Sequence, residues 1–304
     1  MSGRGAWSQT PRTVKLIVPV VPGGAPDILA RVLSEHFGRT PGQTMVVENR
    51  PGASALIGTE AVARAAPDGG TLLMSTAQLV INPHLRKLSF DPLTDLEPIC
   101  DAATAPTLVA VNSASPYRTL ADLLDAARSR PGALTLASIG PASSYHIAFE
   151  MLRRMADFNM TFVPYAGSAP AISAVLGDHV TAVFTDYASL AEQLKAGKLR
   201  ALATGSRTRI EPLPDLPTIA ESGYKDFELN VWFGVLAPGK TPKETISQFI
   251  GWFTVALQSP EIKARFALQG FYPVGSCGAD FSAMLRKQYD DFGRIIREAG
   301  IRAE

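Results

Sequence analysis

The sequence predicts an α/β protein of two domains, with mostly parallel sheets flanked by helices. Short runs rich in β-branched residues alternate with amphipathic stretches from Val14 onward, and this alternation is typical of βαβ units. Nine such runs precede residue 240, which is many for one open sheet and favours two domains. The last quarter of the chain is mainly helical in pattern.

Strands are expected where a short apolar run ends at turn-forming residues. In chain order these are Val14–Val20, Met45–Glu48, Thr71–Ser75, Thr107–Val111, Leu134–Ser138, Thr161–Tyr165, Val180–Phe184, Leu199–Ala203, Leu229–Leu236 and Phe271–Val274. Helices are expected where apolar residues recur every three or four positions. These are Ile28–Phe37, Ala55–Ala65, Leu120–Arg128, Tyr145–Met155, Ile172–Leu176, Leu190–Lys195, Thr241–Gln258, Glu261–Gln269 and Phe281–Ala299.

The chain is expected to cross twice between the domains. One crossing falls near Ala105–Pro106 and the other near Tyr224–Phe227. Residues 13–106 and 227–304 would then form domain 1, and residues 107–226 would form domain 2. Two crossings make a hinge rather than a single flexible linker.

Composition excludes several classes of protein. With 46% hydrophobic and 19% charged residues, the 304-residue chain can bury a core and is not disordered. The net charge of +1 indicates no nucleic acid partner and no anionic membrane surface. No apolar run reaches 18 residues, so no membrane span is expected. Met1–Pro11 lack the apolar core of a secretory leader, which leaves open a cytosolic protein or an exported one whose leader was removed.

Metal, redox and catalytic chemistry have no clear candidates. Cys100 and Cys277 are far apart and in no metal-binding spacing, and the sequence favours two unrelated thiols over a single bridge. The four histidines form no i,i+4 pair, and no Gly-x-Gly-x-x-Gly follows a strand. We therefore expect no metal, no cofactor and no enzymatic activity.

Two loops between a strand and a helix could bind an anion. In the first, Gly23 and Gly24 allow a tight turn, and Pro26 suits the first turn of a helix. Free N–H groups at such a helix start favour an anion, although a plain turn with Asp27 stabilising its own helix explains the pattern equally well. The second loop, Ser138–His146, offers Ser143 or Ser144 as helix cap and His146 in the first helical turn.

One motif favours a different function. Gly234–Thr241 satisfies the P-loop pattern, follows a strand and precedes a helix, and Val180–Asp186 resembles a strand ending in a magnesium-binding acid. That strand lies upstream of the motif, whereas P-loop enzymes place it downstream. Only 63 residues follow Thr241, nearly all helical in pattern. We expect a strand and a turn here, with a nucleotide-dependent enzyme as the alternative.

Several segments together resemble one known family, the Bug-type (TctC-like) periplasmic solute-binding proteins of tripartite tricarboxylate transporters. The resemblance runs from Val14 to Ile301, with the segments in the family order. The matching segments are Lys15–Pro19, Gly23–Asp27, Val46–Ala53, Ala61–Gly69, Asn82–Pro83, Phe162–Tyr165, Ala196–Leu202, Leu213–Thr218 and Trp232–Gly234.

The resemblance implies a two-domain periplasmic-binding-protein (Venus flytrap) fold, with a small carboxylated solute between the domains. In the family pattern, the first loop holds one carboxylate with backbone groups, and the second loop supplies a serine and a histidine. The ligand-binding residues expected on this basis are Val20, Pro22, Gly23, Gly24, Ala25, Asp27, Gln78, Ser138, Gly140, Ala142, Ser143, His146, Tyr165 and Asp186. We expect the Ser143 hydroxyl to face the cleft.

Three departures from the family pattern cluster at this site. Val20 replaces the usual Phe, and Ala142 replaces the second Gly of the second loop. Thr185 stands where the family has a cleft Asp, with Asp186 one place later. A one-residue slip along a strand reverses the side-chain direction, so Asp186 need not take the usual role.

The function expected from the resemblance is capture of a small mono- or dicarboxylate in the periplasm. The partners would be that solute and the membrane subunits of a tripartite tricarboxylate transporter, and the protein would be a monomer. A soluble sensor that presents its solute to a signalling receptor is a second alternative.

Overall fold

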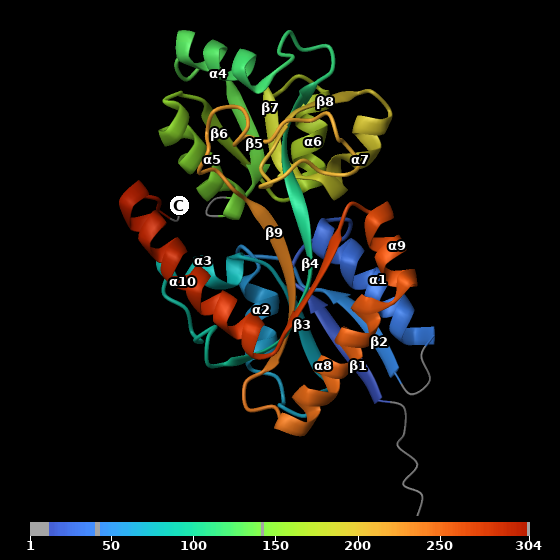
Figure 1. The fold of residues 1–304 in the computed structure, drawn as a ribbon. Helices are drawn as coiled ribbons and strands as arrows, with labels where there is room; N and C mark the ends of the chain where they lie inside the picture. The colour runs from blue at the N-terminus through green and yellow to red at the C-terminus, as the bar shows by residue number, and fades with distance from the viewer. Residues whose placement is uncertain (1–11, 40–42, 141–142, 303–304) are drawn as a thin grey trace, which may run out of the picture.

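The computed structural model describes residues 12–39, 43–140 and 143–302. The chain forms two lobes joined by long strands (Figure 1). Lobe 1, the lower lobe in Figure 1, holds the N-terminal part of the chain and its last helices. Lobe 2, the upper lobe, holds the middle of the chain.

Lobe 1 begins with three parallel strands and three helices. The order β2-β1-β3 follows from two βα crossovers, because Leu16 pairs with Val47 on one side and with Leu72 on the other. The elements are β1 (Arg12–Val18), α1 (Ala25–Arg39), β2 (Gln43–Asn49), α2 (Leu56–Ala63), β3 (Thr71–Ser75) and α3 (Gln78–Leu85). Helix α3 is missing from the predicted elements, because it is short and contains Pro83.

Lobe 2 repeats the same construction around the parallel strands β7-β5-β6. Its elements are α4 (Leu120–Ser129), β5 (Thr135–Ile139), α5 (Ser144–Ala156), β6 (Thr161–Tyr165), α6 (Ser168–Leu176), β7 (Ala182–Asp186), α7 (Tyr187–Lys195) and β8 (Leu199–Thr204). Each lobe buries its own apolar residues, as Phe37 and Phe253 do in lobe 1 and Phe149 and Phe184 do in lobe 2.

Two antiparallel strands connect the lobes: β4 (Leu96–Asn112) and β9 (Asn230–Pro238). Strand β4 pairs with β9 up to Pro106 and with β7 from Thr107 onward. The strand expected at Thr107–Val111 therefore covers only the last part of β4, which begins at Leu96. The domain boundaries themselves stay a prediction.

The sheet is mixed rather than mostly parallel. Among the described strands, β1, β2 and β3 are parallel, as are β5, β6 and β7, whereas β4 runs antiparallel to β7, β8, β9 and β10. The prediction of parallel sheets fails at the centre because the chain leaves lobe 1 along β4 and returns along β9 in the opposite direction.

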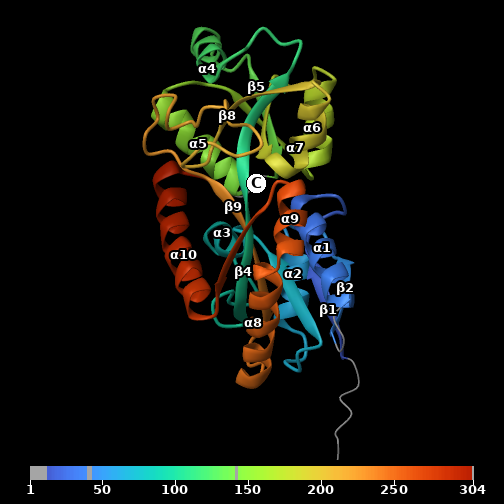
Figure 2. The same ribbon diagram turned by 45° about the vertical axis from the view of Figure 1, so that its right-hand side comes forward.

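The end of the chain packs back onto lobe 1 (Figure 2). It consists of α8 (Lys243–Gln258), α9 (Pro260–Leu268), β10 (Tyr272–Cys277) and α10 (Ala279–Ala299). Helix α10 packs closely against β9. A Cβ on Gly234 of β9 would lie only 2.2 Å from the ring of Phe281 in α10, so only glycine fits at this position.

The P-loop-like segment is the end of β9 followed by a turn, as expected. Lys240 has a φ of +65°, and the Thr241 hydroxyl donates a hydrogen bond of 2.6 Å to the Pro238 carbonyl. Gly234 lies within the strand, where it meets Phe281 rather than a ligand. The segment therefore forms no glycine-rich phosphate cradle.

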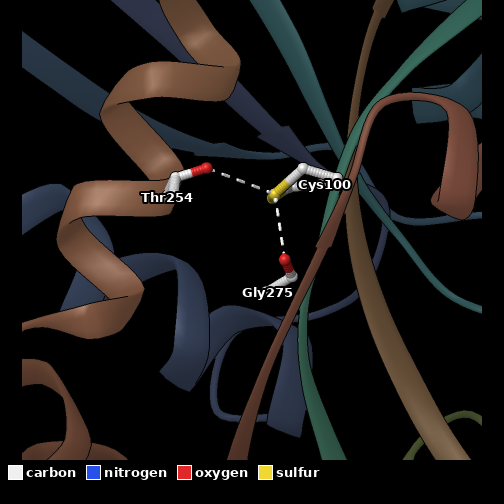
Figure 3. Close-up of a disulfide and its surroundings, with 4 residues drawn as sticks. Cys100, Thr254 and Gly275 are labelled. Atoms are coloured by element: carbon white, nitrogen blue, oxygen red, sulfur yellow. Dashed lines mark hydrogen bonds between the residues drawn. A yellow bond between two sulfur atoms is a disulfide. The ribbon is translucent and has the colours of Figure 1, made fainter.

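Cys100 and Cys277 form a disulfide, so the prediction of two unrelated thiols is wrong. The two residues face each other on the antiparallel strands β4 and β10. Figure 3 shows this bridge beside α8, where the Thr254 hydroxyl lies 3.7 Å from the Cys277 sulfur. A separation of 177 residues gives no local signal of the pairing, because only the return of β10 to β4 brings the thiols together.

Candidate functional site

A cavity lies between the lobes, with about 620 Å³ of empty volume including its open mouth. Its wall contains residues of both lobes and of β9. Among the described residues it is lined by Val20, Val21, Pro22, Gly24, Ala25, Pro26, Thr76, Gln78, Ile139, Ser144, Tyr145, Ala166, Gly167, Ser168, Ala169, Asp186, Val231 and Phe233.

Five helices begin at the cavity wall. Helices α1 and α3 approach from lobe 1, and α5, α6 and α7 approach from lobe 2 (Figure 1). The first N–H groups of a helix have no partner within the helix, and the helix dipole adds positive potential there. No Lys, Arg or His is among the described lining residues. The cavity can therefore bind an anion through backbone groups rather than through cationic side chains.

The first loop reaches across to lobe 2. Gly23 has a φ of +86°, a conformation that L side chains rarely adopt, and this turn brings Gly24 and Ala25 to the cavity wall. On the other side, a Cβ on Gly167 would lie 3.4 Å from the Val21 side chain. The loop before α1 and the loop before α6 therefore face each other across a narrow gap.

Asp27 supports the first loop from behind instead of lining the cavity. It is 2% exposed and accepts hydrogen bonds of 2.9 Å from the Gly23 N–H, from Arg31 Nε and from Asn49 Nδ2. Burial alone would raise the pKa of Asp27, but these hydrogen bonds together hold the pKa below its ordinary value of 3.8. Its charge thus fixes the turn that presents Gly24.

The second loop places Ser143 away from the cavity. The Ser143 hydroxyl accepts a hydrogen bond of 3.2 Å from the His146 N–H and donates one of 2.5 Å to the Ile139 carbonyl. It is the N-cap of α5, and the next residues, Ser144 and Tyr145, line the cavity instead. The hydroxyl that was expected to face the cleft is thus engaged in the helix cap, and its contact with a solute stays a prediction.

Other residues of the second loop also support the fold. The His146 ring stacks on Phe162 with ring centroids 4.2 Å apart. The Ser138 hydroxyl donates a hydrogen bond of 2.7 Å to the Phe184 carbonyl, and the Gly140 N–H donates one of 2.8 Å to the Tyr165 carbonyl. These contacts hold β5 against its neighbours in lobe 2.

Replacing Ser143 with Ala is expected to lower the free energy of unfolding by about 1 kcal/mol, because the helix loses its cap. Affinity for a bound solute should change less than about twofold, which is under 0.5 kcal/mol. Urea denaturation and calorimetric titration of the same variant measure both quantities. Thr119→Ala, which removes the cap of α4, is the matched control. A tenfold loss of affinity with unchanged stability would show that the Ser143 hydroxyl contacts the solute.

Of the residues expected from the sequence, six line the cavity: Val20, Pro22, Gly24, Ala25, Gln78 and Asp186. Ala142 falls outside the described residues. The remaining ones, which the cavity lining does not include, are Gly23, Asp27, Ser138, Gly140, Ser143, His146 and Tyr165.

A third loop, which is not among the expected binding loops, also lines the cavity. Ala166–Ala169 follows β6 and opens α6, and all four residues line the cavity. A glycine between a strand and a helix was the available signal, as in the other two loops. Helix α6 begins at Ser168, four residues before the predicted start at Ile172, so the loop is shorter and its glycine lies closer to the helix than the pattern indicates. The other lining residues that were not expected are Val21, Pro26, Thr76, Ile139, Ser144, Tyr145, Val231 and Phe233.

No group of three or more His, Cys, Asp or Glu residues in the described part of the chain could hold a metal ion. None of its helices is long and apolar enough to cross a membrane.

Two α/β lobes, joined by crossing strands and separated by a small-molecule cavity, define a binding protein of the periplasmic type. The chain belongs to the tripartite tricarboxylate transporter family receptors, whose family model matches residues 29–301. The resemblance seen in the sequence motifs is thereby confirmed.

Individual relatives are similar along nearly their whole length. BugT of Bordetella pertussis is 33% identical, with 95% of this chain and 90% of BugT covered. The periplasmic binding protein BugD is 32% identical, with a TM-score of 0.89 over 96% of this chain and 99% of BugD. The structure of R. palustris Rpa4515 with adipate is 31% identical, with a TM-score of 0.92 over 97% of this chain and 99% of that one.

Proposed function

We propose that this protein captures a small mono- or dicarboxylate in the periplasm and delivers it to the membrane subunits of a tripartite tricarboxylate transporter. The observation that carries the proposal is the cavity itself, where five helices begin and no cationic side chain is among the described lining residues. Two of these helices, α5 and α7, are capped by Ser143 and Asp186, which leaves the starts of α1, α3 and α6 for a solute. The similar protein Rpa4515 was solved with adipate, which is a carboxylate.

Backbone groups are sufficient for binding of useful strength. A hydrogen bond to a charged group contributes about 1.5–3 kcal/mol, and a helix start adds about 0.3–1 kcal/mol. Four or five such contacts give on the order of 10 kcal/mol. Association costs at least about 4 kcal/mol, so about 6 kcal/mol remains, which corresponds to a Kd of roughly tens of micromolar. Binding then needs neither a catalytic group nor a cofactor, and we propose that the protein is a binding protein and not an enzyme.

The test is a thermal-shift screen with acetate, hexanoate, benzoate, succinate, malate and adipate, each compared with its neutral amide. At least one carboxylate should raise the melting temperature, since a ligand at 100 times its Kd stabilises by about 2.7 kcal/mol. Its amide should not, because the helix starts favour a negative charge. Equal shifts for acid and amide, or no shift with any acid, would contradict the proposal.

ATP with magnesium provides the comparison with the nucleotide alternative. Because Lys240 lies in a plain turn after β9, millimolar ATP should give no shift in the wild-type protein or in Lys240→Ala. A magnesium-dependent shift that disappears in Lys240→Ala would replace the carboxylate proposal.

A further inference from the structure

The cavity carries a negative charge of its own. Asp186 is the one side chain with a formal charge among its described lining residues, and it is 1% exposed. A buried carboxylate at the wall of an anion-binding cavity needs an explanation, because a second negative charge nearby is unfavourable in a medium of low dielectric.

Hydrogen bonds fix the Asp186 carboxylate in place. Its Oδ1 accepts 2.8 Å from the Ser189 N–H, which caps α7. Its Oδ2 accepts a hydrogen bond of 3.1 Å from the Tyr145 hydroxyl and one of 3.3 Å from the Thr185 hydroxyl. The positive end of α7 is therefore already occupied by a carboxylate of the chain itself.

Tyr145 maintains this arrangement. Burial raises the pKa of Tyr145 well above 10, and the neighbouring Asp186 carboxylate raises it further. The tyrosine hydroxyl thus keeps its proton and remains a donor to Asp186. The Thr185 hydroxyl lies 3.0 Å from that of Ser168, which is the first residue of α6, so the polar network also holds the start of that helix.

The rest of the cavity divides into two parts. The starts of α1 and α6 face each other across the gap between Val21 and Gly167. The first turn of α1 contains Asp27, but this carboxylate is paired with Arg31 behind the loop and does not line the cavity, and the first turn of α6 has no carboxylate. The remaining wall includes the apolar side chains of Ile139, Val231 and Phe233. This arrangement suits one carboxylate at the two helix starts and an apolar body beside it.

We infer that the cavity prefers a monocarboxylate with an apolar body over a dicarboxylate of the same length, and that Asp186 is the residue that excludes the second carboxylate. This inference rests on the proposed function, since it names the class of solute for the same cavity. It concerns specificity alone, because the first carboxylate is expected at the starts of α1 and α6, and Asp186 caps neither of these helices.

Three six-carbon acids that differ only at the far end test the inference: hexanoate, adipate and 6-aminohexanoate. Calorimetric titration of the wild-type protein should give an affinity for hexanoate at least about tenfold higher than for adipate. In Asp186→Asn, which keeps the cap but removes the charge, the ratio should fall by about tenfold or more. Asp186→Ser, another capping residue, should shift the ratio in the same direction. Glu192→Gln, an exposed change on α7, is the matched control and should leave the ratio unchanged.

Four results would overturn the inference. The first is that the wild-type protein binds adipate as tightly as hexanoate, and the second is that the hexanoate-to-adipate affinity ratio is unchanged in both Asp186 variants. The third is that 6-aminohexanoate binds most tightly of the three acids. The fourth is that hexanoate does not bind although another carboxylate of the screen does. Any of these leaves the proposed function standing, because none of them removes the preference for a carboxylate over its neutral amide.

Discussion

Replacing Asp101 with Asn is expected to raise the free energy of unfolding by about 4 kcal/mol at pH 8 and by less than about 1 kcal/mol at pH 4. Asp101 lies on β4 between β9 and β10 and is 7% exposed. Its Oδ1 has no hydrogen-bond partner among the described residues, and burial raises the pKa of the carboxyl to about 7. Burying a carboxylate there costs far more free energy than burying the neutral amide of Asn.

The direction of the pH dependence follows from this raised pKa. An unfolded chain loses the Asp101 proton near its ordinary pKa of 3.8, while the folded protein keeps it up to about pH 7. The contribution of Asp101 to the free energy of unfolding is therefore most favourable in acid. It decreases as the pH rises from about 3.8 to about 7 and does not decrease further above that range. Each unit of pKa difference corresponds to about 1.4 kcal/mol, which gives the expected 4 kcal/mol.

Urea denaturation of both proteins at pH 4 and pH 8 measures this difference. Asp226→Asn, an exposed aspartate in lobe 2, is the control and should change stability by less than about 0.5 kcal/mol at both values. A variant that is less stable than the wild type at pH 8, or a difference that is equal at the two pH values, would contradict the raised pKa of Asp101 in the folded protein.

Much of the fold is predictable from the sequence because each lobe consists of βαβ units. The alternation of strand and helix patterns locates β1 to β3 and β5 to β8 within a few residues of their observed bounds. Strand β4 is not predictable in the same way. Pro98 and Pro106 interrupt its pattern, and its partners come from both lobes and from the end of the chain.

The candidate site is only partly predictable, and for a physical reason. A strand, a glycine and a helix indicate where free N–H groups gather, and this pattern correctly brings Gly24 and Ala25 to the cavity. The same pattern does not determine which way a side chain points. From the sequence alone, Ser143 could equally well cap a helix or contact a ligand. The structure shows its hydroxyl as part of the cap, where it donates a hydrogen bond to the Ile139 carbonyl. Pairing across the sheet, as for Cys100 and Cys277, is also invisible to local patterns.

Filling the cavity should abolish solute binding while the fold persists. Ala169 is the second residue of α6, is exposed, and lines the cavity wall. A Trp at this position would occupy the space beside the starts of α1 and α6. Exposed substitutions usually change stability by less than about 0.5 kcal/mol, so Ala169→Trp should fold normally. Its affinity for a carboxylate should fall about a hundredfold or more, a loss of about 2.7 kcal/mol.

Ala121→Trp is the matched control, because Ala121 is also the exposed second residue of a helix, α4, and does not line the cavity. Calorimetric titration of hexanoate and adipate into the wild-type protein and these two variants is the most direct test that the cavity between the lobes is a carboxylate site. We expect binding in the wild type and in Ala121→Trp, and none in a folded Ala169→Trp. Undiminished carboxylate binding by Ala169→Trp would show that the solute is held elsewhere and would contradict the assignment of this cavity.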